Sequence, residues 1–145
     1  MFVPNYFIDS NVFLRPVVKD DKKAADDCEI VLKKLSQEKK KFFTSTLVLA
    51  EIIWVGEKFY KIPKADIVII LKGILAIRNL KVIDKFNPIW AIEEYGIMNI
   101  KFIDCLLASI LFGQRGKMTI VSYDRDFDKI KGLTRVEPQE IINFL

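Results

Sequence analysis

The sequence has no histidine and only two cysteines, Cys28 and Cys105, among its 145 residues. Without histidine, Ser-His-Asp and Cys-His catalysis, the usual catalytic zinc sites and the commonest proton shuttle are all excluded. The two cysteines lie far apart in the chain, so we expect them to be reduced and packed rather than joined in a disulfide or a zinc site. Any enzyme here must therefore use carboxylates, hydroxyls, lysines or a metal ion.

The chain also lacks long hydrophobic runs. Its most apolar stretches, residues 47–55 and 67–77, are interrupted by Glu51 and Lys72 and are too short to span a bilayer. The amino terminus has no basic segment followed by an apolar one, which is the pattern of a signal peptide. No stretch is rich in Pro, Gly or Ser, and no segment repeats. We therefore expect a cytoplasmic protein with no membrane partner, built as a single domain over residues 1–145.

Segments typical of strands and helices alternate along the chain. The expected strands are residues 6–8, 42–43, 81–83, 118–121 and 134–136. The expected helices are a short one ending near Pro16, then residues 22–38, 47–54, 64–77, 88–95 (ended by Gly96), 102–112 and 138–144. In the helix over 64–77, the expected inner face is Ile67, Ile70, Leu71, Ile74 and Leu75. This alternation predicts an α/β fold with a central, mostly parallel sheet and helices on both of its faces.

Two of the expected strands run directly into an acidic turn. Asp9 follows residues 6–8, and Asp124 follows residues 118–121. Ligands of open α/β sheets bind beyond the carboxyl ends of the strands, which makes both carboxylates candidates for chemistry. The alternative is that Asp9 or Ser10 only caps the helix that follows.

Two further acidic residues lie in strongly apolar helices. Glu51 stands about one and a half turns inside its helix, so it must reach a solvated edge or be held by a partner such as a cation, and we favour the cation. Asp104 stands at or near the start of its helix. There it is either an N-cap or a metal ligand beside the sheet, and both interpretations are open at this point.

The alternating aspartates Asp124, Asp126 and Asp128 are similar in spacing to an EF-hand calcium loop. Such a loop needs glycine at its sixth position and glutamate at its twelfth, where this chain has Lys129 and Arg135. An EF-hand is therefore excluded. A metal or phosphate site at the end of the strand remains.

The parallel sheet should bring four carboxylates to one edge: Asp9, Glu51, Asp104 and Asp124. Clustered carboxylates stay ionised together only when a cation neutralises them, and ligation by oxygen alone favours Mg²⁺ or Mn²⁺ over zinc. The chemistry that follows is metal-assisted hydrolysis of a phosphodiester. The net charge of +4 and the lysines at 33–34 and 39–41 permit nucleic-acid binding, although a solvated helix face has the same pattern.

Four segments of the chain, residues 7–11, 45–51, 103–108 and 120–127, resemble the signature blocks of PIN domains. They occur in the order found in that family and span nearly the whole chain. The resemblance implies a three-layer α/β/α fold and a Mg²⁺- or Mn²⁺-dependent ribonuclease. Ser10 stands where the family more often has threonine.

The resemblance also implies residue roles. The catalytic, metal-holding acids would be Asp9, Glu51, Asp104 and Asp124, with Asp126 in the outer part of the metal site and Asn11 and Ser122 orienting carboxylates or water. Many small members of the family are toxins of toxin–antitoxin pairs, usually homodimers inhibited by a partner peptide. By analogy, this chain would cut RNA, form a homodimer and bind an antitoxin.

Other function classes fit less well. A phosphatase of the haloacid dehalogenase type needs a second Asp two residues after Asp9, and this chain has Asn11 there. A phosphoacceptor receiver domain needs an acidic pair at the first strand, and the match is poor. The remaining alternatives are a PIN-like module that binds RNA or protein without cutting, and an RNA-processing nuclease without a toxin role. Because every expected acidic position is filled, we favour the nuclease.

Overall fold

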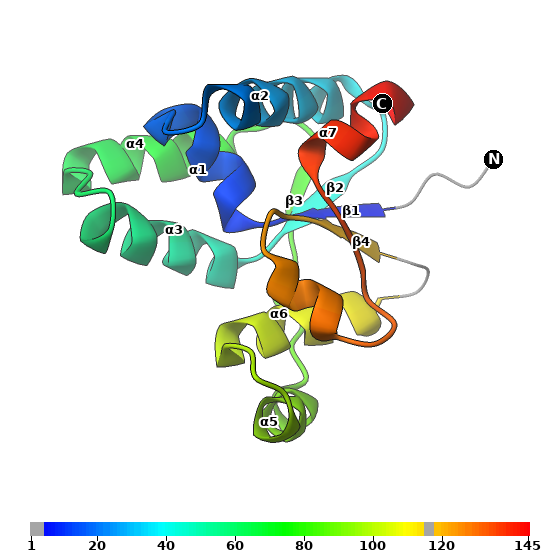
Figure 1. Ribbon diagram of the computed structural model, residues 1–145. Coiled ribbons are helices and arrows are strands. Elements are labelled where there is room, and N and C mark those ends of the chain that lie inside the picture. Colours follow the sequence, from blue (N-terminus) through cyan, green and yellow to red (C-terminus); the bar gives the residue numbers. More distant parts are fainter. Residues whose placement is uncertain (1–4, 115–117) are drawn as a thin grey trace.

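The computed structural model describes residues 5–114 and 118–145, and its centre is a five-stranded sheet (Figure 1). The strands are β1 (Asn5–Ile8), β2 (Phe42–Thr44), β3 (Leu80–Val82), β4 (Met118–Val121) and β5 (Thr134–Val136). Their order across the sheet is β3-β2-β1-β4-β5, and every neighbouring pair is parallel. The predicted parallel sheet is confirmed, and β1 lies at its middle.

Helices cover the sheet on both sides. They are α1 (Ser10–Val18), α2 (Lys22–Gln37), α3 (Thr46–Lys58), α4 (Lys64–Leu75), α5 (Pro88–Ile97), α6 (Phe102–Phe112) and α7 (Pro138–Ile141), with short 3₁₀ helices at Arg125–Lys129 (η1) and Ile142–Phe144 (η2). Figure 1 shows α1, α2 and α7 on one side of the sheet and α5 and α6 on the other, with α3 and α4 projecting beside them. This is the three-layer α/β/α arrangement that the sequence predicted. None of the helices in these ranges is both long and apolar enough to cross a membrane.

The end of α1 differs from the prediction. The helix was expected to end near Pro16, but it continues through this proline to Val18 and ends at Lys19 in the left-handed conformation, with φ of 52°. Proline here forfeits one backbone hydrogen bond of the helix. Val12 and Phe13 are buried in the core, and this packing holds the helix despite the missing bond.

Two other details of the helices were predicted wrongly. Helix α5 passes Gly96 and ends at Ile97, because a glycine inside a helix lowers its stability without terminating it. In α4, Ile67 and Ile74 are buried as expected, whereas Leu75 is 53% exposed. Leu75 is the last residue of the helix, which ends two residues earlier than predicted.

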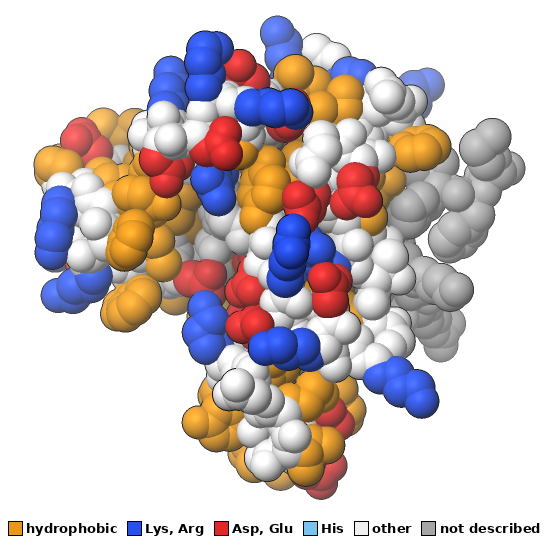
Figure 2. Space-filling view, viewed as in Figure 1, with side chains coloured by type: hydrophobic (Ala, Val, Ile, Leu, Met, Phe, Trp, Pro, Cys, Tyr) orange, Lys and Arg blue, Asp and Glu red, His pale blue; other side chains and the backbone are white. Residues whose placement is uncertain are grey.

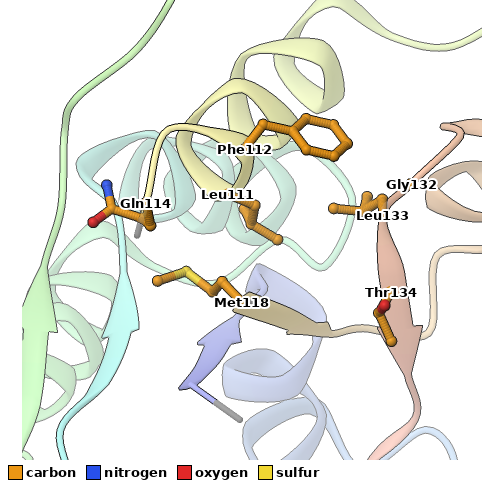
Figure 3. Close-up of a pocket in the computed structure, with 7 residues that line it drawn as sticks. All are labelled: Leu111, Phe112, Gln114, Met118, Gly132, Leu133 and Thr134. Atoms are coloured by element: carbon orange, nitrogen blue, oxygen red, sulfur yellow. The ribbon is translucent and has the colours of Figure 1, made fainter. Parts of the chain in front are cut away.

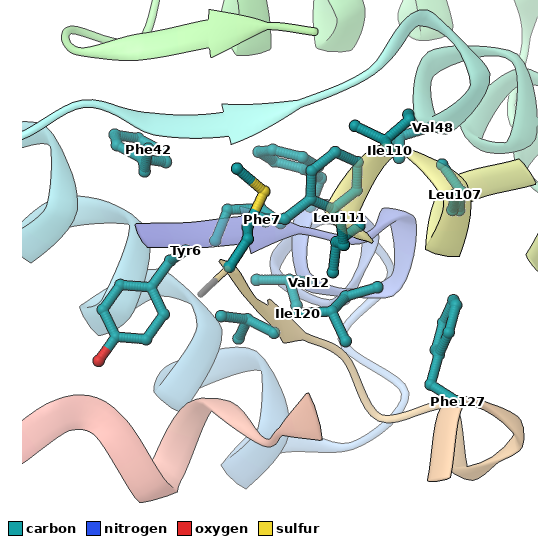
Figure 4. Close-up of a cluster of buried hydrophobic side chains, with 14 of the residues drawn as sticks. Tyr6, Phe7, Val12, Phe42, Val48, Leu107, Ile110, Leu111, Ile120 and Phe127 are labelled. Carbon is teal, nitrogen blue, oxygen red and sulfur yellow. The ribbon is translucent and has the colours of Figure 1, made fainter. Parts of the chain in front are cut away.

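The core fills both sides of the central strands (Figure 4). Phe7, Phe42 and Ile120 come from three adjacent strands and are essentially inaccessible to solvent. Leu107 and Ile110 of α6 are equally buried. Cys28 and Cys105 are buried and free, as predicted. This packing fixes the positions at which the carboxyl ends of β1 and β4 emerge beside the starts of α1 and η1.

Candidate metal centre

Asp9 follows β1 directly and is 3% exposed. It is the N-cap of α1, and its Oδ1 accepts the backbone N–H of Ser10 at 2.8 Å. Its Oδ2 accepts the hydroxyl of Ser122 at 2.6 Å and, more weakly, the amide of Asn11 at 3.4 Å. Asp9 is therefore a helix cap and also a member of a polar network. Its part in the chemistry stays a prediction.

Ser122, the residue after β4, connects the two acidic turns. Its Oγ donates to Asp9 and accepts both the Asn11 Nδ2 at 3.1 Å and the Asp124 backbone N–H at 3.0 Å. The Asn11 side-chain oxygen in turn accepts the backbone N–H of Tyr123 at 3.2 Å. These bonds hold the ends of β1 and β4 in one fixed relation.

Glu51 comes to the same place from α3. Its Oε1 accepts the hydroxyl of Ser10 at 2.5 Å, and its charge raises the pKa of Asp9. The start of α3 is fixed by Ser45, its N-cap, and by Asp84, which accepts the Ser45 hydroxyl and the Thr46 N–H, each at 2.8 Å. Asp84 was not among the residues predicted from the sequence. It lies two residues after the end of β3, and directly after the strand predicted at residues 81–83, which was the available signal.

Asp104 lies in the first turn of α6 and is 2% exposed. It does not cap the helix, because the N-cap residue is Lys101 and Asp104 follows it by three residues. Its Oδ2 is buried and has no hydrogen-bond partner among the described residues. A buried carboxylate oxygen without a hydrogen-bond donor raises the free energy of the folded state. A bound cation would supply the missing partner of this oxygen.

Asp124 and Asp126 lie beside Asp104. One carboxylate oxygen from each of these three residues lies within 4.8 Å of the others. Asp124 also accepts the Asp126 backbone N–H at 2.9 Å, which caps η1, and Asp126 pairs with Lys129 at 2.9 Å. Asp126 was expected in the outer part of the site, and the geometry gives it a place in the tightest acidic group.

The electrostatics of the cluster oppose ionisation of its buried members. Burial, then repulsion by Glu51, raises the pKa of Asp9 to about 7, although the hydrogen bonds from Ser122 and Ser10 act in the opposite direction. Burial also raises the pKa of Asp104 to about 7, and the other acids add to this effect, while Lys101 counteracts it. Figure 2 shows acidic side chains gathered in a hollow at the centre of one face, with Lys and Arg beside them.

These donors fit a hard divalent cation. The acidic residues offer oxygen ligands only, and the unpaired Oδ2 of Asp104 lies within the group of three. Mg²⁺ and Mn²⁺ prefer such oxygen donors, and a cation would compensate the repulsion that raises the two pKa values. Asp9 and Glu51 are not members of this group of three. Ser122 links Asp9 to Asp124, and Ser10 links Glu51 to Asp9.

A cavity of about 170 Å³ lies at the far end of α6 (Figure 3). It is bordered by Phe112 and by Met118 and Thr134, which begin β4 and β5. It is therefore at the amino ends of these strands, opposite the acidic cluster. The described residues that line it carry no charge, so this cavity is not a candidate for the same chemistry.

Comparison with known proteins agrees with this architecture. The family described as PIN domain matches residues 6–133. A chain in the crystal structure of VapBC2 from Rickettsia felis bound to a DNA fragment from their promoter superposes with a TM-score of 0.66 and 22% sequence identity, over 91% of this chain and 97% of that chain. At this identity the likeness shows a shared fold. None of the curated proteins matches the chain.

Proposed function

Because this chain belongs to the PIN domain family, whose members are nucleases, we propose that it is an endoribonuclease that uses Mg²⁺ or Mn²⁺ at its acidic cluster. The observation that carries this proposal is the buried Oδ2 of Asp104, which has no partner among the described residues and lies beside Asp124 and Asp126. A buried acidic group of this kind needs a cation. A phosphodiester is a substrate that such a cation and a basic protein surface both attract.

We assign the cation to the acids of the cluster. Asp104, Asp124 and Asp126 form its closest group, and Asp9 and Glu51 complete the set. When bound, the ion would activate water for attack and stabilise charge on the phosphate.

The remaining residues of the centre hold these acids in place. Ser122 and Asn11 fix the Asp9 carboxylate, and Ser10 fixes that of Glu51. Lys101 sits at the N-cap of α6 beside the acids. Its positive charge favours the ionised form of Asp104, which is the form that binds a cation.

We further propose that the protein is the toxin of a toxin–antitoxin pair, cytoplasmic, and a homodimer that binds an antitoxin. The resemblance to small PIN toxins and the shared fold with a chain of the VapBC2 structure support this role. Large apolar side chains exposed on the surface support binding to protein partners. Trp54 and Ile69, on α3 and α4, are 65% and 68% exposed, and Ile97 on α5 is 79% exposed.

The test is cleavage of a panel of single-stranded and structured RNAs by purified protein, with Mg²⁺, with Mn²⁺ and with a chelator. The Asp104→Asn variant is compared with Asp66→Asn, which changes an exposed acid at the equivalent first-turn position of α4. We expect metal-dependent cutting by the parent and by Asp66→Asn, and none by Asp104→Asn. Equal cutting by a folded Asp104→Asn variant would contradict the assignment. A folded protein that binds metal and RNA but cuts nothing would instead be a binding module.

A further inference from the structure

A groove of about 680 Å³ begins at the acidic cluster and runs toward α5. Its walls come from the end of α5, the connection between α5 and α6, and η1. Asp126 lines the groove and also belongs to the closest acidic group, so the groove adjoins the proposed metal centre. A nucleic-acid strand with one phosphate at this centre could therefore extend along the groove.

Tyr95 provides an aromatic surface in this groove. Its side chain is 54% exposed. The ring of Phe102 packs against it, with the centroids 5.8 Å apart and the planes at 75°. This contact restricts the motion of the Tyr95 ring and leaves more than half of the residue accessible. A held, exposed ring of this kind is a surface on which an unpaired nucleobase stacks.

Two lysines line the same groove. Lys129 contacts Asp126 at 2.9 Å and donates to the backbone oxygen of Asn99 at 3.3 Å. An ammonium group has three N–H donors, so one remains for another acceptor. Lys101, the N-cap residue of α6, also lines the groove. The two lysines provide positive charge along a groove that ends at carboxylates, as a phosphodiester backbone requires.

We propose that this groove binds the single-stranded RNA segment next to the scissile phosphate, with a base stacked on Tyr95 and the backbone held by Lys129 and Lys101. The inference rests on the proposed function and adds the residues that select an unpaired strand. A base in a duplex has neighbours on both faces, so it cannot stack on Tyr95 without leaving the helix. Tyr95 therefore determines specificity, and Lys129 positions the phosphate backbone.

The test measures binding of a labelled single-stranded oligoribonucleotide by fluorescence anisotropy, in the Asp104→Asn background with Mg²⁺. The same strand without bases and the same sequence as a duplex are the comparison ligands. We expect the base-free strand to bind about tenfold more weakly than the intact strand, as the loss of a stacking contact predicts. Both ligands are bound by the same protein with Tyr95 unchanged. The comparison is therefore valid even if a substitution at Tyr95 impairs folding.

Substitutions then locate the effect. We expect Tyr95→Ala to weaken binding of the intact single strand about tenfold and to leave binding of the base-free strand and the duplex unchanged. Tyr95→Phe should bind as the parent does, and so should Phe144→Ala, which removes an exposed aromatic residue outside the groove. Lys129→Gln should reduce the salt slope of binding to the single strand by about 0.7, whereas Lys131→Gln, an exposed lysine two residues away, should not. In the cleaving parent, Tyr95→Ala should raise KM more than it lowers kcat.

The possible failures are distinguishable. If the parent cuts RNA with metal but Tyr95→Ala binds and cuts as the parent does, the groove inference is wrong and the proposed function stands. An equal loss of affinity for the intact and base-free strands would also overturn it, because stacking would not be the cause. If the parent binds no RNA of any kind, both proposals fail. Binding of a peptide alone would assign the groove to a protein partner and overturn the inference.

Discussion

Ser122 Oγ lies 2.6 Å from Asp9 Oδ2, across 113 residues of sequence, and the same oxygen accepts the Asp124 backbone N–H at 3.0 Å. One hydroxyl thus sets the positions of two acids that follow different strands. This bond also lowers the pKa of Asp9 against the effects of burial and Glu51. Ser122 therefore favours the ionised Asp9 that a metal ion requires.

Replacing Ser122 with alanine should weaken metal binding. We expect Ser122→Ala to reduce affinity for Mn²⁺ by about 10- to 100-fold, the usual effect of losing a residue that orients a ligand. Loss of a hydrogen bond to a buried carboxylate should lower the free energy of unfolding by about 1–3 kcal/mol at neutral pH. Calorimetric titration and urea unfolding measure these two effects. The control is Ser36→Ala, whose hydroxyl donates to the Lys33 carbonyl on α2, and an equal effect there would refute the role of Ser122.

Neutralising Asp104 should stabilise the metal-free protein. Burial and neighbouring acids disfavour the charged form of Asp104 and raise its pKa to about 7, so its charge destabilises the fold above that pH. We expect Asp104→Asn to raise the free energy of unfolding at pH 8 in chelator by about 1–2 kcal/mol. The control is Asp66→Asn, which changes an exposed acid in the first turn of α4. It should change the free energy of unfolding by less than about 0.5 kcal/mol. A loss of stability in Asp104→Asn alone would show that this carboxylate is needed by the fold.

Metal-free stability should fall as pH rises. Asp9 and Asp104 have pKa values of about 7 in the folded protein, against an ordinary value of 3.8. The folded state therefore binds more protons than the unfolded state between about pH 4 and pH 7, and the free energy of unfolding decreases over this range. Added Mg²⁺ or Mn²⁺ should reverse the trend, because it binds the ionised form. Thermal unfolding from pH 5 to pH 8, with metal and with chelator, tests this. A metal-induced rise in Tm that is larger at pH 5 than at pH 8 would contradict it.

The sequence was sufficient for the features that depend on local pattern. The boundaries of α6, β4 and β5 were predicted correctly, and those of α6 and β4 are marked by apolar runs with flanking polar residues. Glu51 was noticed because it interrupts an apolar helix, and its contact with Ser10 gives that position a physical reason. The parallel direction of the strands follows from the alternation of strands and helices, and it brings the carboxyl ends of the strands to one edge.

Features that depend on tertiary contacts were not predictable in this way. The role of Asp84 in holding the start of α3 arises only once β2 and β3 pair, since it contacts Ser45 across 39 residues. The passage of α1 through Pro16 depends on core packing that outweighs a local rule. The closeness of Asp126 to Asp104 depends on the turn geometry of η1. In the first two cases the deciding contacts come from the tertiary fold, and in the third they come from a turn whose geometry the local pattern does not specify.

RNA binding should weaken steeply with salt. The chain carries a net charge of +4, and the groove beside the acidic cluster is lined by Lys101 and Lys129. Each phosphate neutralised on a single strand contributes about 0.7 to the slope of log affinity against log salt. The two lysines therefore predict a slope of at least about 1.4 in magnitude, measured by anisotropy with the non-cleaving Asp104→Asn variant. A flat response would show that RNA is not held through its phosphates.

Dimer formation should depend on the apolar surface of α3 and α4. Figure 2 shows hydrophobic side chains over these helices, and Trp54, Phe59 and Ile69 are each at least 65% exposed. An apolar surface of this kind is stabilised when a partner covers it. We expect light scattering to give twice the 16.8 kDa chain mass for the parent and the single mass for Trp54→Glu. Ile97→Glu, which places the same charge on α5, should leave the dimer intact. If Ile97→Glu is monomeric and Trp54→Glu remains dimeric, the prediction is wrong and the interface lies on α5. The reason is that an added charge disrupts a dimer only where the interface buries it.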